Sequence, residues 1–387
     1  MIKICTVTGS RAEFFILKKL ISKLQNKKIF SHYLLVTGSH NSKFFGKTIN
    51  DIKKENISIS GIIDLNIRGD KASDISKYFS LGVKKFSKKF LSLKPDLLMV
   101  LGDRYEVFSA TIAAYLNHIP IVHIYGGETT QGSLDEGIRH SITKLSNIHF
   151  VSTKKYFDRV KQLGENPSYI FNVGSMGVES IKNHKIIKRN NLEKILNIKF
   201  DQKNILMTFH PETTKSKNEN IKNLKQCLNS LRKLKKTSII ITMPGADHNY
   251  KIIYSILKKF SQKNKNVFLL KSLGHDYYFS ICRIIDFMIG NSSSGIIEMP
   301  SFSKPTINLG NRQLGRIQAK SVLNVDFEEN RISHAIKKAF SARYKKSLSK
   351  INNPYEKNNS SDKILKVIKT INLKKLKTKK FFDYKYL

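Results

Sequence analysis

Two short apolar runs, at Leu97–Leu101 and Ile119–Ile124, constrain the fold of this chain more than any other feature of its sequence. Their length and their aliphatic content are typical of strands that are buried on both faces of a parallel sheet. A helical pattern at Tyr105–Asn117 separates them. Parallel neighbours need such a crossover, so the three segments predict a βαβ unit and an α/β fold.

The same alternation of strand and helix patterns runs through the rest of the chain. It pauses at the Lys- and Asn-rich stretch Asn183–Asp201 and starts again at Ile205–Thr208. A chain of 387 residues is also longer than a single core usually grows. We therefore predict two Rossmann-like domains, 1–185 and 200–345, and a C-terminal helix and tail at 355–387. Further strands are predicted at Ile2–Val7, His32–Thr37, Ile57–Leu65, His149–Ser152, Tyr169–Val173, Ser238–Thr242, Val267–Leu270, Asp286–Ile289 and Thr306–Leu309.

The chain is strongly basic, with a formal net charge of +40. Such a charge often indicates a nucleic-acid partner. Here the lysines are scattered through every predicted helix and do not form one basic stripe with interleaved aromatic residues, so we expect solvated lysine faces and no nucleic-acid binding. A positive field of this kind still concentrates anionic substrates near the surface.

The cysteines and the lengths of the apolar runs indicate in which cellular compartment the protein is expected. Cys5, Cys227 and Cys282 are far apart and lack metal-ligand spacing, which predicts buried thiols in a reducing cytoplasm. The first residues lead directly into a predicted strand and lack the charged, apolar and cleavage-site regions of a signal peptide. No apolar run reaches the roughly 18 residues of a membrane span. We expect a cytoplasmic protein with no membrane partner.

Acidic residues follow both apolar runs with which the prediction began. Asp103 comes after the first strand and Glu128 after the second. Groups just beyond the carboxyl ends of neighbouring parallel strands converge on one crevice, where two carboxylates can act as general acid and base. The alternative is that Asp103 and Glu136 only cap the helices that follow them. Both interpretations stay open for each residue alone, but the cluster favours a functional site.

Two loops have the character of anion sites. Gly9 and Arg11 lie between the first strand and its helix, where backbone amides and a helix N-terminus point at an anion. The second loop follows a buried strand and precedes a helical pattern at Ile296–Met299, which favours phosphate binding over plain capping. Its residues are Ser292, Ser293, Ser294 and Gly295.

Six motifs in order carry a resemblance to a known family. They are VTGSRAE, VLGDRYE, HIYGGETTQGSLDEGIRHSITKLS, FHPET, GNSSSGIIEMPS and INLGNRQLGR, which span about Thr6 to Arg316. Together they resemble the hydrolysing UDP-N-acetylglucosamine 2-epimerases of bacterial sialic acid and legionaminic acid synthesis. Six ordered motifs are far more specific than any one of them.

The resemblance implies a fold and a reaction. The family fold is GT-B, an α/β fold in which two Rossmann-like, doubly wound domains face each other across a cleft and the C-terminal helix crosses back. Family members abstract the proton at sugar C2, eliminate UDP to leave a glycal, and add water to give N-acetylmannosamine. They use no nicotinamide and no metal, so we expect no cofactor. Relatives commonly assemble as dimers or tetramers, so a homo-oligomer is expected.

The resemblance also implies roles for individual residues. Asp103, Glu128 and Asp135 match the catalytic carboxylates, and which of them is the base stays open. His210 is assigned to the catalytic residues and lies where the diphosphate is expected. The predicted UDP-binding residues are Arg11, Ser292, Ser293, Ser294, Gly295 and Glu298, of which Glu298 resembles a glutamate that binds the ribose hydroxyls.

Several neighbouring residues have two open interpretations. Arg139 lies four residues after Asp135 and could pair with it on a helix. His123 is either catalytic or a satisfied histidine at a strand end. Arg312, Gln313 and Arg316 resemble the late family motif and either line the site or lie on the surface. Tyr125 stands where some relatives have a glutamate, which favours the hydrolysing branch, and Gly245 replaces an asparagine found before Asp247 in many relatives.

The sequence leaves alternatives open for the substrate and for the class of protein. The first prediction is UDP-N-acetylglucosamine as substrate, and the alternative is the same chemistry on UDP-2,4-diacetamido-2,4,6-trideoxyglucose for legionaminic acid. A GT-B glycosyltransferase would share the nucleotide site but has no need of three acids around C2. A nucleic-acid-binding protein is supported by the net charge alone.

Overall fold

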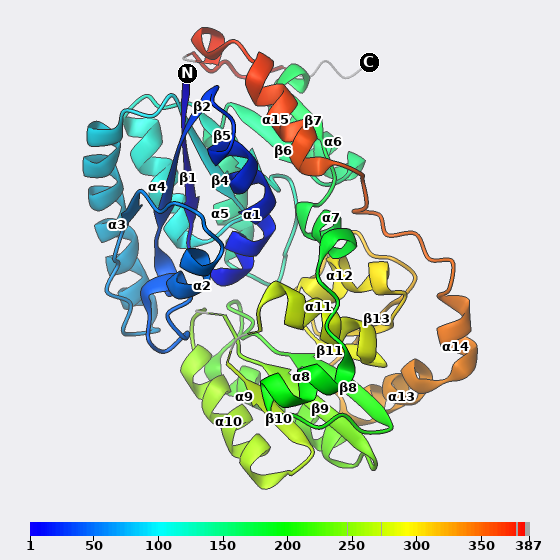
Figure 1. Ribbon diagram of the computed structural model, residues 1–387. Coiled ribbons are helices and arrows are strands. Elements are labelled where there is room, and N and C mark those ends of the chain that lie inside the picture. The colour runs from blue at the N-terminus through cyan, green and yellow to red at the C-terminus, as the bar shows by residue number, and fades with distance from the viewer. Residues whose placement is uncertain (246, 272, 377, 384–387) are drawn as a thin grey trace. The chain divides into compact units, whose positions relative to one another are not determined.

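The chain folds into two compact units, shown in Figure 1, a computed structural model that describes residues 1–245, 247–271, 273–376 and 378–383. The first unit comprises Met1–Glu128, Asp135–Ser180 and the chain from Lys357 onward. The second comprises Thr129–Leu134 and Ile181–Glu356. The short segment Thr129–Leu134 therefore interrupts the first unit along the sequence and groups with the second.

The first unit is built on a seven-stranded sheet in the order β3-β2-β1-β4-β5-β6-β7. All paired strands are parallel, and Thr6 of β1 pairs with Leu34 of β2 and with Met99 of β4. The strands are β1 (Ile2–Thr8), β2 (Phe30–Val36), β3 (Gly61–Ile62), β4 (Leu97–Leu101), β5 (Ile121–Ile124), β6 (Ile148–Val151) and β7 (Ile170–Asn172). The helices are α1 (Arg11–Gln25), α2 (Ile49–Lys54), α3 (Ala72–Leu93), α4 (Tyr105–Leu116), α5 (Asp135–Leu145), α6 (Lys154–Gln162), α7 (Met176–Asn183) and α15 (Ser360–Thr370).

The second unit has a six-stranded parallel sheet in the order β10-β9-β8-β11-β12-β13. Its strands are β8 (Lys203–Thr208), β9 (Thr237–Thr242), β10 (Val267–Leu270), β11 (Phe287–Gly290), β12 (Thr306–Leu309) and β13 (Val322–Val325). Its helices are α8 (Arg189–Leu196), α9 (Lys217–Arg232), α10 (Tyr250–Lys263), α11 (His275–Ile284), α12 (Ser294–Ile297), α13 (Glu329–Phe340) and α14 (Ala342–Ser347). Short 3-10 helices lie at Gly38–Asn41, Pro167–Tyr169, Met299–Phe302 and Leu373–Leu376.

The apolar strands feed two cores in each unit, because alternate side chains of a strand point to opposite faces of the sheet. In β4, Leu97, Met99 and Leu101 enter the core that α1 and α15 cover, whereas Leu98 and Val100 enter the core that α3 and α4 cover. The second sheet is sandwiched in the same way, with α9, α10 and α13 on one core and α8 and α11 on the other. This double burial explains why the strands read as continuous apolar runs.

Each sheet has the strand order of a Rossmann fold. Counted within its own unit, the order is 3-2-1-4-5-6, with one further strand at the edge of the first sheet. The prediction of doubly wound parallel sheets is therefore confirmed. Three details differ. The third strand, expected at Ile57–Leu65, is only the two-residue edge strand β3, the strand β13 was missed, and helix α8 lies within the stretch predicted to break the pattern.

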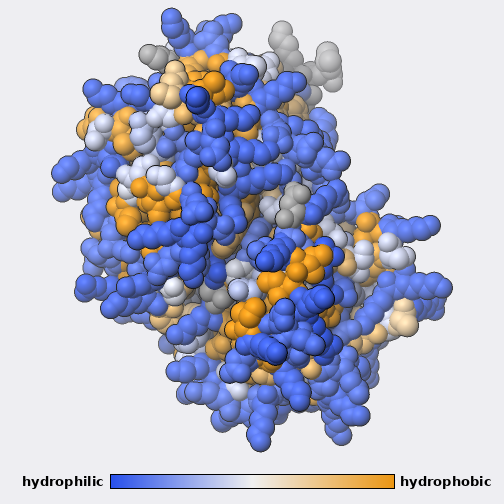
Figure 2. Space-filling model, in the orientation of Figure 1, coloured by the Kyte–Doolittle hydropathy of each residue, from blue (hydrophilic) through white to orange (hydrophobic). Residues whose placement is uncertain are grey.

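Much of the surface is hydrophilic. Figure 2 shows hydrophilic side chains over most of the visible face, with apolar side chains in small separate areas. Among the helices that the structure describes, none is both long enough and apolar enough to span a membrane. Cys5, Cys227 and Cys282 are all buried free thiols.

Candidate functional site

The predicted site residues lie at the switch point of each sheet, where the strand order reverses. In the first unit β1 and β4 are neighbours, and in the second unit β8 and β11 are neighbours. Helices that leave such a strand pair cover opposite faces, so a crevice opens at the carboxyl ends of the strands. Arg11 and Asp103 follow β1 and β4, and His210 and Ser292 follow β8 and β11. Each unit therefore carries its own group of predicted site residues.

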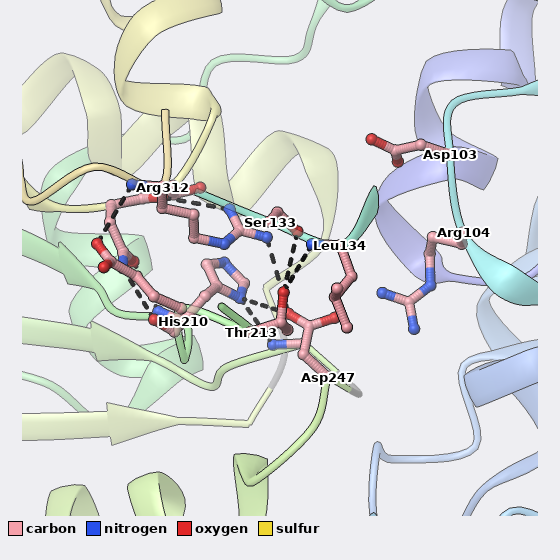
Figure 3. A network of polar contacts seen from close by, with 12 residues as sticks. Asp103, Arg104, Ser133, Leu134, His210, Thr213, Asp247 and Arg312 are labelled. Carbon is pink, nitrogen blue, oxygen red and sulfur yellow. Dashed lines mark hydrogen bonds and ion pairs between the residues drawn. The ribbon is translucent and has the colours of Figure 1, made fainter. Parts of the chain in front are cut away.

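Asp103 is held by a buried arginine. It lies two residues beyond β4 and forms an ion pair with Arg139 of α5, whose side chain is only 3% exposed. Arg139 also donates to the carbonyl oxygen of Tyr125, 3.2 Å away. Asp103 itself is 18% exposed, so part of its side chain is accessible. Figure 3 shows Asp103 beside its sequence neighbour Arg104.

The capping interpretation of Asp103 is wrong. The residue at the N-cap of α4 is Arg104, in an extended backbone conformation, and Asp103 precedes it. A carboxylate at that point cannot occupy the N-cap position that satisfies the first helical amides. The structure leaves the site interpretation of Asp103 in place.

Glu128 and Asp135 belong to the same unit as Asp103. Glu128 follows β5, is 2% exposed, and accepts a hydrogen bond of 2.8 Å from the hydroxyl of Ser152 beyond β6. Asp135 is the first residue of α5. All three predicted carboxylates thus come from loops or helix starts at the carboxyl-end side of β4 and β5.

His123 is a structural histidine. It is fully buried, and its Nε2 lies 2.8 Å from the carbonyl oxygen of Gly102 while its Nδ1 lies 3.1 Å from the Thr143 hydroxyl. Burial is the main cause that lowers the pKa of His123 to about 3. A neutral ring with both nitrogens engaged ties β5 to β4 and α5, which agrees with the satisfied interpretation.

The loop after β1 has the features of an anion site. The Ser10 hydroxyl caps α1 by accepting from the Glu13 amide at 3.4 Å. Arg11 is 19% exposed and forms an ion pair of 3.2 Å with Asp51 of α2. Desolvation is the main cause that lowers the pKa of Arg11, and Asp51 opposes it. The guanidinium is thus positioned at the start of a helix, where an anion is favoured.

Sequence reasoning assigned no site role to Glu13 or Glu106, two buried acids beside this loop. Glu13 is 6% exposed and Glu106 is fully buried. A signal for them was present, since each ends one of the two motifs at the strand ends, VTGSRAE and VLGDRYE.

In the second unit, His210 belongs to a polar cluster that Figure 3 shows from close by. Asn291, which is fully buried, accepts from the His210 amide at 2.7 Å and donates to the His210 carbonyl at 2.8 Å. Asp247 lies 3.7 Å from the His210 ring and 3.7 Å from the Arg312 guanidinium. Asp247 therefore lies in the candidate site, although Gly245 replaces the asparagine of many relatives.

The ring of His210 has a defined tautomer. The amide of Gly245 donates to its Nδ1 at 3.0 Å, so this nitrogen carries a lone pair and the proton is on Nε2. The contact of 3.7 Å between Nδ1 and Asp247 is then an approach of two acceptors, without a hydrogen bond. His210 presents an N–H donor of the kind that can stabilise a developing negative charge.

The late motif also lies in this cluster. Arg312 and Gln313 both donate to the Asn291 carbonyl, at 3.3 Å and 2.9 Å, and Glu212 accepts from the amides of Asn311 and Arg312. The interpretation of Arg312 and Gln313 as surface residues is therefore wrong. Asn291 and Glu212 are further residues that sequence reasoning missed, although both fall within quoted motifs, GNSSSGIIEMPS and FHPET.

The Ser292–Gly295 loop joins β11 to the short helix α12. The Ser294 hydroxyl lies 2.6 Å from the hydroxyl of Tyr278 in α11, and the Ser292 hydroxyl accepts from the Ser294 amide at 3.4 Å. Glu298 is the C-cap residue of α12 instead of lying within a longer helix, because a 3-10 turn begins at Met299. Hydroxyls and amides at the end of a buried strand suit a phosphate.

The segment Thr129–Leu134 packs within the second unit. The Leu134 amide donates to the Thr213 hydroxyl at 2.9 Å, and the Thr214 hydroxyl donates to the Gly132 carbonyl at 3.1 Å. Glu128 and Asp135 immediately flank this segment in the sequence. Within the described residues, no group of three or more His, Cys, Asp or Glu side chains is arranged to hold a metal ion.

Comparison with known proteins identifies the family. The family model described as UDP-N-acetylglucosamine 2-epimerase matches residues 22–369. The chain belongs to the UDP-N-acetylglucosamine 2-epimerase family. Relatives of this epimerase include the GDP/UDP-N,N'-diacetylbacillosamine 2-epimerase (hydrolyzing) of Campylobacter jejuni, which is 41% identical and is matched over 98% of this chain and 99% of its own.

Two further relatives of the epimerase cover most of its length. The polysialic acid biosynthesis protein P7 of Escherichia coli is 37% identical over 99% of this chain and 98% of its own. The UDP-N,N'-diacetylbacillosamine 2-epimerase (hydrolyzing) of Legionella pneumophila is 32% identical over 96% of each chain. The identification from six motifs is confirmed, and the enzyme class is that of a nucleotide-sugar 2-epimerase.

Solved structures confirm the fold of the epimerase as GT-B. A Staphylococcus aureus MnaA–UDP complex superposes with a TM-score of 0.79 at 21% identity and covers 100% of both chains. The UDP-GlcNAc 2-epimerase of Neisseria meningitidis bound to UDP-GlcNAc has the same TM-score and identity and covers 96% of this chain and 100% of its own. At such identities the likeness concerns the fold.

Proposed function

We propose that the epimerase is a hydrolysing 2-epimerase that acts on UDP-N,N'-diacetylbacillosamine, which is UDP-2,4-diacetamido-2,4,6-trideoxyglucose. The carrying observation is the match over nearly the full length, at 41% identity, to a C. jejuni protein with that name. The L. pneumophila relative with a corresponding name supports it independently. We therefore propose the alternative substrate of the sequence analysis ahead of UDP-N-acetylglucosamine.

UDP-N-acetylglucosamine is the second candidate, with N-acetylmannosamine and UDP as products for sialic acid synthesis. It is supported by the 37% identity to the E. coli polysialic acid protein. The two substrates differ only at sugar C4 and C6, whereas the chemistry takes place at C1 and C2. The same acids therefore serve either substrate.

The proposed reaction has two stages. In the first, Asp103 accepts the proton from C2, a double bond forms between C1 and C2, and the bond from C1 to oxygen breaks so that UDP leaves with the electron pair. In the second, water adds across the glycal, with its hydroxyl on C1 and a proton on C2 from the opposite face. This sequence inverts C2 and releases a free sugar with no net oxidation or reduction.

The contacts of the described residues support this division of work. Asp103 forms an ion pair with the buried Arg139, which orients its carboxylate for the proposed role of proton acceptor. Glu128 and Asp135 are the acids proposed to return the proton and to direct the water. We assign UDP binding to Arg11, Ser292, Ser293, Ser294, Gly295 and Glu298, and we assign His210 to the departing phosphate through its Nε2–H.

The reaction is tested by following sugar and nucleotide by NMR in deuterated water. The purified enzyme is incubated with UDP-N,N'-diacetylbacillosamine and, separately, with UDP-N-acetylglucosamine. We expect UDP release, deuterium at C2 of the epimerised sugar, and faster turnover of the first substrate. UDP release without deuterium at C2, or an epimerised sugar still attached to UDP, would contradict the elimination and hydration sequence.

Three expectations accompany this proposal. A homo-oligomer is predicted, and sedimentation of the purified protein tests it. Filter binding across a salt series is expected to show no specific affinity for nucleic acid. A cytoplasmic location is proposed because the three cysteines are free, buried thiols, as in proteins of reducing compartments.

A further inference from the structure

Two buried glutamates flank the loop that follows β1. Glu13 lies in the first turn of α1 and Glu106 in the first turn of α4, so both come from the switch point of the first sheet. A Cβ atom built on Gly9 would lie 3.5 Å from the Glu13 carboxyl oxygen Oε2 and 3.5 Å from the carboxyl carbon of Glu106. Both acid groups therefore pack against Gly9, at the start of the proposed diphosphate loop.

The two acids have unequal partners. The Nε–H of Arg104 donates to the Glu106 carboxyl group, and this nitrogen lies 3.2 Å from each of the two Glu106 carboxyl oxygens. Glu13 accepts a hydrogen bond from the Gly9 amide at 2.7 Å. Its other oxygen, Oε1, is buried and has no hydrogen-bond partner among the residues that the structure describes. Arg104 and Glu106 are the charged groups that act on Glu13 from the neighbouring elements.

The two buried carboxyl groups of Glu13 and Glu106 lie close together, and Arg104 pairs with that of Glu106. Burying an ionised carboxyl group is costly unless it is paired, and a second carboxylate nearby adds repulsion. Glu106 has the guanidinium of Arg104 and the N-terminus of α4 as favourable neighbours for a carboxylate. Two effects raise the pKa of Glu13 to about 7: desolvation by burial is the larger, and the nearby Glu106 carboxylate is the second. Arg104 and the hydrogen bonds from Gly9 and Ser10 oppose this shift.

We propose that Glu13 is the protonated member of a carboxyl pair with Glu106, and that this pair positions the Gly9–Arg11 loop and Arg104 for the diphosphate of the substrate. Glu13 is a positioning residue, since it acts through the Gly9 amide and through the balance of charge around Arg104. The inference rests on the proposed function in that the anion at this loop is the diphosphate of UDP.

Ionisation of Glu13 would oppose binding in two ways. It would place a second negative charge beside the carboxylate that Arg104 binds, and it would add negative charge beside the loop that receives the diphosphate. Binding of UDP is therefore coupled to retention of the Glu13 proton. Protonation of Glu13 favours UDP binding, and bound UDP in turn favours the protonated form of Glu13. The affinity for UDP therefore falls as the pH rises through the pKa of Glu13.

The test compares the wild type with Glu13→Gln by titration calorimetry with UDP between about pH 6 and about pH 8. The amide keeps the shape of a neutral carboxyl group and an oxygen that accepts from Gly9, but it cannot ionise. With a pKa of about 7, we expect wild-type affinity to fall about tenfold across this range relative to Glu13→Gln. Ionisation of UDP itself affects both proteins equally and is removed by the comparison.

Two matched variants complete the design. Glu55→Gln removes a carboxylate that pairs with Lys18 near the surface and is expected to leave the wild-type pH dependence unchanged. Glu106→Gln removes the anchor of Arg104, so UDP affinity should fall at every pH, and the pKa of Glu13 should move back toward its ordinary value. Identical pH dependence in wild type and Glu13→Gln would overturn the proposal.

Infrared spectroscopy of the protein without ligand tests directly whether Glu13 is protonated. In infrared spectra at about pH 6, the difference between wild type and Glu13→Gln should contain the band of a protonated carboxyl group, and this band should disappear by about pH 8. Absence of the band at the lower pH would also overturn the proposal. A failure of the proposed function would look different. The protein would then bind UDP with the Glu13-dependent pH profile but would turn over neither nucleotide sugar.

Discussion

His210 and Asn291 exchange two hydrogen bonds, from the His210 amide to the Asn291 side-chain oxygen and from the Asn291 side-chain nitrogen to the His210 carbonyl, at 2.7 and 2.8 Å. The pair joins the ends of β8 and β11 at the switch point of the second sheet. Asn291 is fully buried, and its two partly buried hydrogen bonds satisfy both the amide and the carbonyl of His210.

Asn291→Ala is expected to destabilise the second unit. The substitution leaves the His210 amide and carbonyl without these partners, and each unsatisfied buried group costs roughly 1–3 kcal/mol. Urea denaturation measures the loss, and calorimetry should show weaker UDP binding because the His210 loop is no longer held. Asn166→Ala, at an exposed position where the side chain accepts from Ser168, serves as control and should change stability by less than about 1 kcal/mol. Equal effects of the two variants would contradict the role given to burial.

Asp103→Asn should separate turnover from nucleotide binding. Removal of a positioned proton acceptor costs roughly 10²- to 10⁴-fold in rate, so kcat should collapse while the Kd for UDP stays within about twofold. Turnover is measured by UDP release and binding by calorimetry. Asp158→Asn, which removes an exposed partner of Lys154, should behave as the wild type. Retained turnover together with lost UDP affinity would return Asp103 to a structural role.

Gly38→Ala should destabilise the first unit. Gly38 has a φ of +62°, and a Cβ atom there would lie 2.3 Å from the Gly9 carbonyl oxygen and 2.8 Å from a carboxyl oxygen of Glu106. Left-handed backbone alone costs a side chain roughly 1–2 kcal/mol, and the backbone contact adds to it. Thermal denaturation measures the loss. Gly137→Ala is the control, because a Cβ at that helical position meets nothing within 4 Å and should stabilise α5 by roughly 0.5–1 kcal/mol.

Lys379 should make stability depend on pH. Its ammonium group donates to the carbonyls of Lys144 and Ser146 at the end of α5 and pairs with Glu165 at 2.7 Å. Burial lowers the pKa of Lys379 from 10.5 to about 8, although Glu165 opposes the shift. Between these two values the unfolded chain holds a proton that the folded protein has released, so the free energy of unfolding rises with pH.

The effect of Lys379 is measured against Lys379→Met by urea denaturation across the range from pH 8 to pH 10.5. The stability of the wild type should rise relative to that variant by roughly 2–3 kcal/mol over the range. Lys380→Met, at an exposed neighbouring position, should follow the wild type. Parallel curves for wild type and Lys379→Met would contradict the prediction.

Much of the fold follows from local pattern. The run Leu97–Leu101 has the same bounds in the prediction and in the structure, because a strand buried on both faces admits only apolar residues. The edge strand β3 was overestimated and β13 was missed, because edge strands have fewer buried neighbours to constrain their sequence. The acids at strand ends could be located for the same reason, since charge directly after an apolar strand stands out.

Partners within the site were decided by tertiary structure. The arginine that holds Asp103 comes from α5, 36 residues further along the chain, and the amide group that engages His210 comes from Asn291, 81 residues further along. Sequence spacing on one helix suggested a different pairing for Arg139, with Asp135. Contacts across a sheet depend on strand order, which no local spacing encodes.

The sequence by itself determined the parallel α/β architecture, the family, and the positions of the acids and anion loops, because each of these is written in short segments of chain. Only the tertiary structure decided which groups are buried together. Glu13 reads in the sequence as an ordinary acid in the first turn of a helix, and it becomes a candidate proton carrier because α4 brings Glu106 and Arg104 to the same place. Burial and the nearness of like charge act through space, so the strand order of the sheet creates them.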